Sequence, residues 1–140
     1  MSFELDPPSI ETAGSILQRQ CHGASAAAGW WQDAKTGVDY LNEVRTGTRF
    51  GKALVAEKIA LAHSELSEGL EGLRKNLQDD KLPHRKMLEV ELADAVIRIF
   101  DLAGSLEFDL GAAIAEKMQF NQVRPDHKIE NRAAEGGKGF

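Results

Sequence analysis

Two acidic pairs with the same spacing are the residues of this sequence best suited to chemistry. Glu65 and Glu68 form one pair, and Glu91 and Asp94 form the other. Residues three apart lie on one face of a helix, so each pair would present two carboxylates in the same direction. Both pairs border the apolar side of their predicted helices. Because unpaired buried carboxylates are costly, the four acids would need a compensating cation.

The two pairs are placed symmetrically about a predicted turn at Asp79 and Asp80. Pro83 supports this turn, because proline disfavours helix in the residue before it and suits a helix start. If the flanking helices fold back antiparallel, the pairs lie at the same height and face each other. Four converging carboxylates favour Mg²⁺, with Mn²⁺ as a substitute. For either pair taken alone, the alternative is a solvated acidic helix face.

A second set of polar residues lies near the end of the chain. Lys117, Asn121 and Arg124 are spaced so that they share one helix face. Two cations flanking an amide can neutralise and orient a triphosphate, whereas cations near a helix C-terminus are also favoured without any ligand. Lys138 stands between glycines, either as a phosphate ligand or as part of a frayed terminus. The spacing leaves both alternatives open.

The tryptophan pair Trp30 and Trp31 offers a flat aromatic wall for a nucleobase. Adjacent helical residues diverge by about 100°, so we expect at most one of them to face a pocket. Two core or dimer-contact aromatics are the alternative. Arg98 comes one turn after Asp94, where it would pair with Asp94 or Asp101 or reach a phosphate.

The elements that must position these residues are predicted to be helices, and no segment has a convincing strand pattern. The segment 33–51 reads as a connection that has room for one short turn of helix. Residues 1–125 are expected to form a helical catalytic domain. The basic, glycine-rich tail 126–140 would be either flexible or ordered by a ligand. The predicted helices cover residues 9–31, 52–76, 84–106 and 109–123, with Pro125 ending the last.

Length and composition narrow the function classes. The chain has 140 residues, which is the size of one globular domain, and a formal net charge of −5. A mildly acidic domain is a poor candidate for binding duplex nucleic acid. No apolar run approaches 20 residues, so we expect no membrane span and a cytoplasmic protein. Cys21 is the single cysteine, the histidines are scattered, and phosphate-cradling glycine loops are absent, which argues against zinc clusters and P-loop chemistry.

The acidic motifs resemble a known family. The run Lys58–Glu71, followed by Glu91-Leu92-Ala93-Asp94, looks like the ExxE…ExxD signature of MazG-like all-α nucleoside triphosphate pyrophosphohydrolases. Dimeric dUTPases, dCTP pyrophosphatases and phosphoribosyl-ATP pyrophosphohydrolases belong to the same superfamily. The Lys-x-x-x-Asn-x-x-Arg-Pro run at 117–125 resembles the C-terminal region of the family. The sequence departs from it at Ser64, where many members have an acid, so the number of bound ions stays open.

The resemblance implies a four-helix-bundle-type MazG-like fold, assembled as a homodimer or homotetramer. It also implies that the four acids bind Mg²⁺ and that the C-terminal region helps to bind a nucleotide. The expected reaction is hydrolysis of a (d)NTP to the monophosphate and pyrophosphate, with a weak preference for a purine such as dGTP. Phosphoribosyl-ATP or a pyrimidine dNTP is the alternative substrate. A non-enzymatic helical interaction module is the alternative outside the enzymes.

Overall fold

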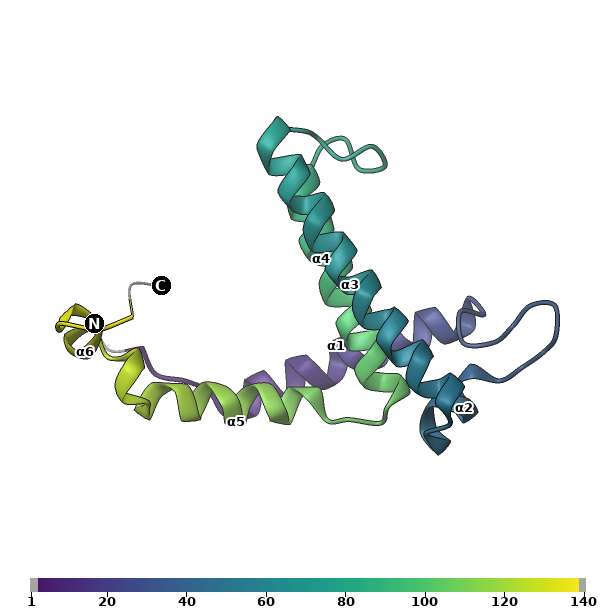
Figure 1. Ribbon diagram of the computed structural model, residues 1–140, viewed down its shortest axis with the longest axis horizontal. Helices are drawn as coiled ribbons and strands as arrows, with labels where there is room; N and C mark the ends of the chain where they lie inside the picture. Colours follow the sequence, from purple (N-terminus) through teal and green to yellow (C-terminus); the bar gives the residue numbers. More distant parts are fainter. Residues whose placement is uncertain (1–2, 139–140) are drawn as a thin grey trace. The chain divides into compact units, whose positions relative to one another are not determined.

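The computed structural model describes residues 3–138, which are mostly helical and contain no β-strand (Figure 1). This confirms the predicted all-α class. None of the helices in these residues is long and apolar enough to cross a membrane. The helices are α1 (Pro7–Ala27), α2 (Tyr40–Thr46), α3 (Arg49–Lys75), α4 (Met87–Ser105), α5 (Leu110–Val123), the 3-10 helix η1 (Pro125–His127) and α6 (Ile129–Ala133).

The chain divides into two compact units. The larger unit comprises residues 17–108 and contains the second half of α1 with α2, α3 and α4. The smaller unit comprises residues 3–16 and 109–138. In the smaller unit α1 and α5 meet through glycines, because a Cβ on Gly14 would lie 2.5 Å from the Cα of Gly111.

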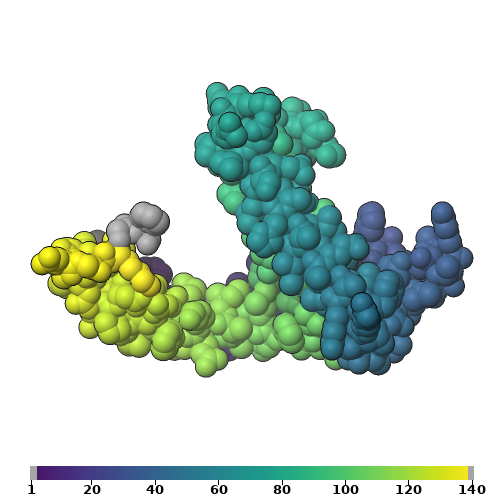
Figure 2. All heavy atoms as spheres, in the orientation of Figure 1, coloured from purple at the N-terminus to yellow at the C-terminus, as the bar shows by residue number. Residues whose placement is uncertain are grey.

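The α3–α4 hairpin is the central feature of the larger unit, with the two helices side by side (Figures 1 and 2). Thr48 caps the start of α3 by accepting a hydrogen bond from the Gly51 amide, and Asn76 ends it in the left-handed conformation. The buried Asp79 side chain holds the turn, accepting hydrogen bonds from the amides of Lys81 (3.0 Å) and Leu82 (2.6 Å). The hairpin geometry on which the predicted acidic site depends is therefore present.

Glycines allow α3 and α4 to approach closely beside the predicted site. Gly69 and Gly72 are buried on α3. A Cβ on Gly69 would lie 3.3 Å from the Cβ of Glu91, and one on Gly72 would lie 2.8 Å from the Cβ of Met87. This close contact brings the α4 backbone near the acids of α3.

The apolar core of the larger unit lies at the other end of the hairpin from the turn. It is centred on Trp31, Val44 and Leu54. Partly buried apolar side chains from α2, the start of α3 and the end of α4 pack around these three: Tyr40, Leu41, Val55, Leu102 and Leu106. The hairpin is thus anchored by apolar packing at one end and closed by a hydrogen-bonded turn at the other.

Most predicted helix positions agree with the structure, with two differences. The first helix ends at Ala27 instead of Trp31, because Gly29 adopts a positive φ of 82° and turns the chain. The predicted connection 33–51 contains a separate seven-residue helix, α2, whose N-cap Asp39 accepts a hydrogen bond from the Asn42 amide. The tail beyond Pro125 contains only the short helices η1 and α6.

Replacing Gly72 with alanine should destabilise the protein by about 1–3 kcal/mol, the usual cost of overpacking a close contact. The matched control is Gly23→Ala in α1, where an added Cβ meets nothing within 4 Å. This control should be neutral or stabilising by up to about 1 kcal/mol, because alanine favours helix over glycine. Urea unfolding of both variants measures the difference, and equal effects would contradict the close helix contact.

Candidate metal centre

Three of the four predicted acids come together between α3 and α4. Glu65 from α3 and Glu91 and Asp94 from α4 each offer a carboxylate oxygen, and these oxygens lie within 4.8 Å of one another. Glu65 and Glu91 are each only 7% exposed, and Asp94 is half-buried. The antiparallel hairpin therefore creates a cluster of oxygen donors that are largely withdrawn from water.

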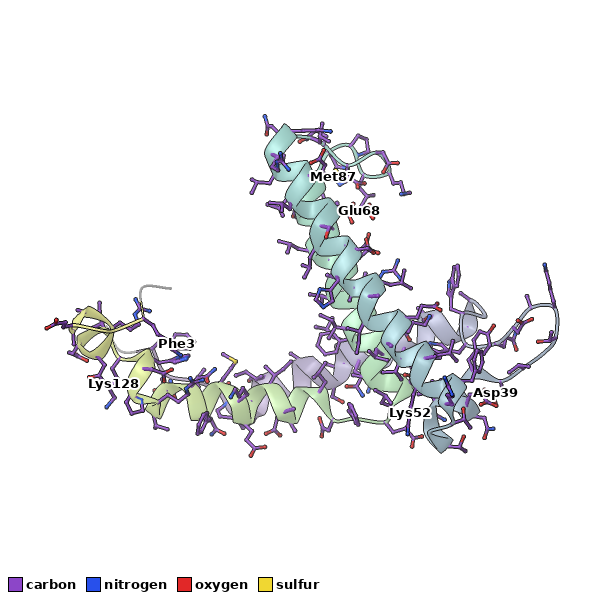
Figure 3. The ribbon with its side chains drawn as sticks, in the orientation of Figure 1. Phe3, Asp39, Lys52, Glu68, Met87 and Lys128 are labelled. Carbon is purple, nitrogen blue, oxygen red and sulfur yellow. The ribbon has the colours of Figure 1, made fainter. Side chains whose placement is uncertain are left out.

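Glu68 lies at the edge of this cluster. It is exposed on α3, one turn after Glu65, and is not one of the three converging acids (Figure 3). Its charge nevertheless acts on the cluster, because it contributes to raising the pKa of Glu91. The structure thus brings together three predicted ligands and leaves the fourth at the rim.

Burial and the neighbouring acids oppose ionisation of Glu91. Burial, a hydrogen bond with Glu65 and the charges of Glu68, Glu65 and Asp94 together raise the pKa of Glu91 to about 7. The ionised form of Glu91 is disfavoured because it would add a negative charge to a buried, already acidic site. A bound cation would remove this penalty.

Arg98 is the cation that contacts the cluster. Its guanidinium Nε donates a hydrogen bond to Oε1 of Glu65 on the facing helix. The spacing of Arg98 from Asp94 predicted that it lies near the site. The expected acidic partners were Asp94 and Asp101, whereas the observed partner is Glu65. The cross-helix pairing depends on the relative rotation of α3 and α4, which spacing within one helix does not define.

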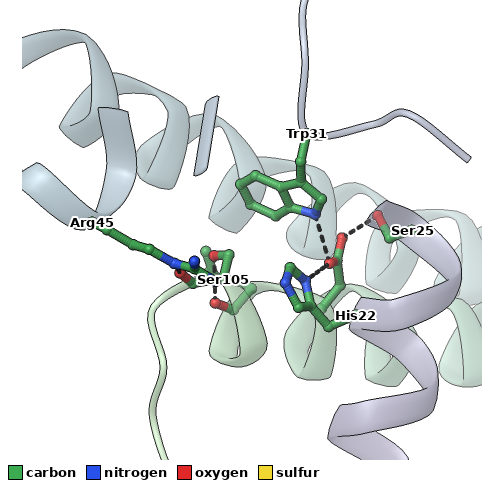
Figure 4. Close-up of polar contacts among 7 residues, drawn as sticks. His22, Ser25, Trp31, Arg45 and Ser105 are labelled. Atoms are coloured by element: carbon green, nitrogen blue, oxygen red, sulfur yellow. Dashed lines mark hydrogen bonds and ion pairs between the residues drawn. The ribbon is translucent and has the colours of Figure 1, made fainter. Parts of the chain in front are cut away.

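Asp101, a buried carboxylate outside this cluster, forms hydrogen bonds with the region that precedes α2. Its Oδ1 accepts a hydrogen bond from Nε1 of Trp31 and lies 2.8 Å from Nδ1 of His22, while its Oδ2 accepts one from the Ser25 hydroxyl. Figure 4 shows these three side chains converging. Seven residues separate Asp101 from Asp94, which places both on one side of α4. That spacing was the available sequence signal for Asp101.

The two tryptophans have different environments. Trp31 is 3% exposed and packs beneath Lys58, whose Nζ lies 4.7 Å from the ring centroid. Trp30 is 68% exposed. Both residues lie beyond the end of α1, so the helical spacing expected between them does not apply. Their role in binding a base stays a prediction.

The predicted phosphate-binding residues lie in the smaller unit, and two of them share one acid. Arg124 forms a forked contact with Asp126, with its Nη2 2.6 Å from Oδ2, and Nζ of Lys138 lies 3.1 Å from that same oxygen. These cations hold the pKa of Asp126 well below its usual range. Nζ of Lys117 lies 4.8 Å from the Phe120 ring. Phosphate binding by these residues stays a prediction.

Asn121 is the remaining predicted member of this set. Its Oδ1 is buried and has no hydrogen-bond partner within residues 3–138. Such an acceptor is costly to leave unpaired. Its contribution to a nucleotide site also stays a prediction.

No protein-family profile, curated protein or solved structure matches this chain. Conclusions about function therefore depend on the chemistry of the site. The cluster contains only carboxylates, without histidine or cysteine. Oxygen-only donors suit Mg²⁺ or Mn²⁺ and argue against a zinc site.

The metal-free protein should lose stability as the pH rises from about 5 to about 7.5. The pKa of Glu91 is raised from 4.5 to about 7, so in this window the folded state binds more protons than the unfolded state. Glu91→Gln should flatten the dependence and raise the melting temperature at pH 8 by roughly 3–5 °C, the shift that about 1 kcal/mol produces in a domain of this size.

Thermal unfolding in the presence of a chelator measures this effect. Glu89→Gln is the control, because Glu89 is an exposed acid on the same helix and forms a surface pair with Arg85. It should leave the slope of the pH dependence unchanged. A wild-type melting temperature that rises across the window would contradict the strained carboxylate cluster.

Proposed function

We propose that this protein is a Mg²⁺-dependent nucleoside triphosphate pyrophosphohydrolase, which converts a (d)NTP to the monophosphate and pyrophosphate. The observation that carries the proposal is the convergence of Glu65, Glu91 and Asp94 from two antiparallel helices. The resemblance of these motifs to MazG-like enzymes supports the same reaction. Mn²⁺ is expected to replace Mg²⁺.

The chain's own residues support this assignment in two ways. Glu65, Glu91 and Asp94 would hold the metal, with Glu68 at the rim of the site. The burial and mutual repulsion that raise the pKa of Glu91 favour uptake of a dication over an empty site. A bound Mg²⁺ would bind phosphate oxygens and lower the pKa of a coordinated water.

The nucleotide would also require cations that neutralise its phosphates. Lys117, Arg124 and Lys138 are the proposed ligands, with Asn121 between the first two on α5. Arg124 already forms a forked contact with a carboxylate, which is the geometry that arginine uses for phosphate. In this proposal the phosphates replace Asp126 as the partner of Arg124 and Lys138.

The base and sugar are the least defined part of the substrate. We retain a weak preference for a purine deoxynucleotide such as dGTP, with phosphoribosyl-ATP or a pyrimidine dNTP as alternatives. A panel of NTPs and dNTPs with Mg²⁺ or Mn²⁺, assayed for pyrophosphate, identifies the substrate. Release of orthophosphate alone would contradict the proposed reaction.

Loss of a metal ligand should abolish turnover. Glu65→Gln and Asp94→Asn are each expected to lower kcat by at least about 100-fold, because residues that merely support a metal ligand already cost roughly 10–100-fold when mutated. Both variants should also lose the increase in melting temperature that Mg²⁺ gives the wild type. Glu89→Gln serves as the control and should retain activity. Full activity in both ligand variants would favour the non-enzymatic interaction module.

We further propose that the hairpin pairs with a second copy of the chain to complete a four-helix bundle, giving a homodimer or homotetramer. Exposed apolar residues directly follow buried contact residues along both helices: Leu66 follows Glu65, Leu70 follows Gly69, Leu73 follows Gly72, Leu92 follows Glu91 and Val96 follows Ala95. One step along a helix turns the side chain by about 100° from the contact line, and on two antiparallel helices this turn leads to the same side of the pair. We call the exposed apolar residues on this side the apolar flank.

The apolar flank makes a matched test of assembly possible. Ile99 continues the flank and is 46% exposed, whereas Ile97 is 47% exposed but about 200° away on the same helix. Ile99→Glu should weaken self-association by at least about 10-fold, because a buried unpaired charge at an interface is costly. Ile97→Glu should not. Sedimentation equilibrium measures both, and a monomeric wild type would contradict the proposed bundle.

A further inference from the structure

The acidic cluster contains more negative charge than the cation beside it can balance. Three carboxylates meet between α3 and α4, and Arg98 supplies the hydrogen-bonded positive charge. Arg98 is hydrogen-bonded to Glu65, which is itself one of the three converging acids. A metal ion and the Arg98 guanidinium would therefore compete for the same carboxylate.

The rest of the Arg98 side chain is available for another partner. A guanidinium carries five N–H donors, and within residues 3–138 Glu65 is the acceptor that Arg98 contacts, through Nε. The side chain is 39% exposed, whereas that of Glu65 is 9% exposed. The partly exposed guanidinium thus offers its two Nη groups to a ligand at the edge of a buried acidic site. This is the arrangement that binds a phosphate in two places.

We propose that Arg98 is an exchangeable counter-ion: it neutralises Glu65 in the metal-free protein, and it transfers to a substrate phosphate when a divalent cation occupies the carboxylates. This inference rests on the proposed function, because it assumes a metal–phosphate ligand at this site. It adds a phosphate-binding residue on α4 to those expected in the C-terminal region. In the metal-free protein, Arg98 would balance part of the negative charge between α3 and α4.

The alternative role for Arg98 is a permanent bridge between α3 and α4. The two roles predict opposite changes in metal affinity when Arg98 is replaced. A bridge that is lost should loosen the hairpin and weaken metal binding, whereas removal of a competing cation should strengthen metal binding. Both measurements below are made on the full-length protein by equilibrium binding and do not depend on turnover.

Titration calorimetry with Mn²⁺ tests the first half of the exchange. For Arg98→Gln we expect Mn²⁺ to bind about 5–10-fold more tightly than to wild type, because one unit of competing positive charge is gone. Arg85→Gln removes the same charge from an exposed pair with Glu89 and should change the affinity by less than about twofold. Weaker or unchanged Mn²⁺ binding by Arg98→Gln would overturn the proposal.

Titration with pyrophosphate at saturating Mn²⁺ tests the second half. Arg98→Gln should bind pyrophosphate at least about 10-fold more weakly than wild type, because a forked arginine–phosphate contact is lost. Arg98→Lys keeps the charge but lacks the fork, so its Mn²⁺ affinity should stay within about twofold of wild type while pyrophosphate binding weakens. Unchanged pyrophosphate binding in both variants would overturn the proposal.

Two outcomes separate this inference from the proposed function. A wild-type protein that binds no Mn²⁺ would overturn both. Normal Mn²⁺ binding that is lost in Glu65→Gln, together with no gain in Arg98→Gln, would retain the metal site and overturn the exchange alone. If Arg98→Gln does not fold, as judged by circular dichroism, Arg98→Lys provides the deciding comparison.

Discussion

The repulsion between buried carboxylates at the α3–α4 contact is the constraint on which the rest of the structure depends. Glu65 and Glu91 face each other across two helices that the small residue Gly69 allows to approach closely. Burial and the neighbouring acids at this contact raise the pKa of Glu91 to about 7, and Arg98 donates a hydrogen bond to Glu65. Ionisation of Glu91 is unfavourable in such an arrangement, because it adds a negative charge beside other acids in a buried site.

Different interactions hold the two ends of the hairpin. Trp31, Val44 and Leu54 form the apolar core of the larger unit at one end, and the indole N–H of Trp31 is satisfied by the buried Asp101. The turn at Asp79 closes the other end. The acids therefore lie between the apolar core at one end of the hairpin and the hydrogen-bonded turn at the other. The hairpin brings the three acids together, and a hydrogen bond joins two of them, Glu65 and Glu91.

The sequence was sufficient to predict the two helices of the hairpin and the turn between them, because these follow from local spacing and from the turn residues. It did not predict α2 as a separate helix or the end of α1 at Ala27. It did not predict which of the four acids would converge, since the exposure of Glu68 depends on how α3 is rotated against α4. The same rotation determines that Arg98 contacts Glu65. The Asp101 network, which joins positions 70 or more residues apart in sequence, was likewise outside the reach of helical periodicity.

We propose that these carboxylates form a divalent-metal site. A crystal structure of the protein grown with Mn²⁺, with anomalous data collected at the manganese edge, tests it most directly. We expect an anomalous peak bound by carboxylate oxygens of Glu65, Glu91 and Asp94, the donors that hard cations prefer. A map without a peak between α3 and α4 would contradict this metal site.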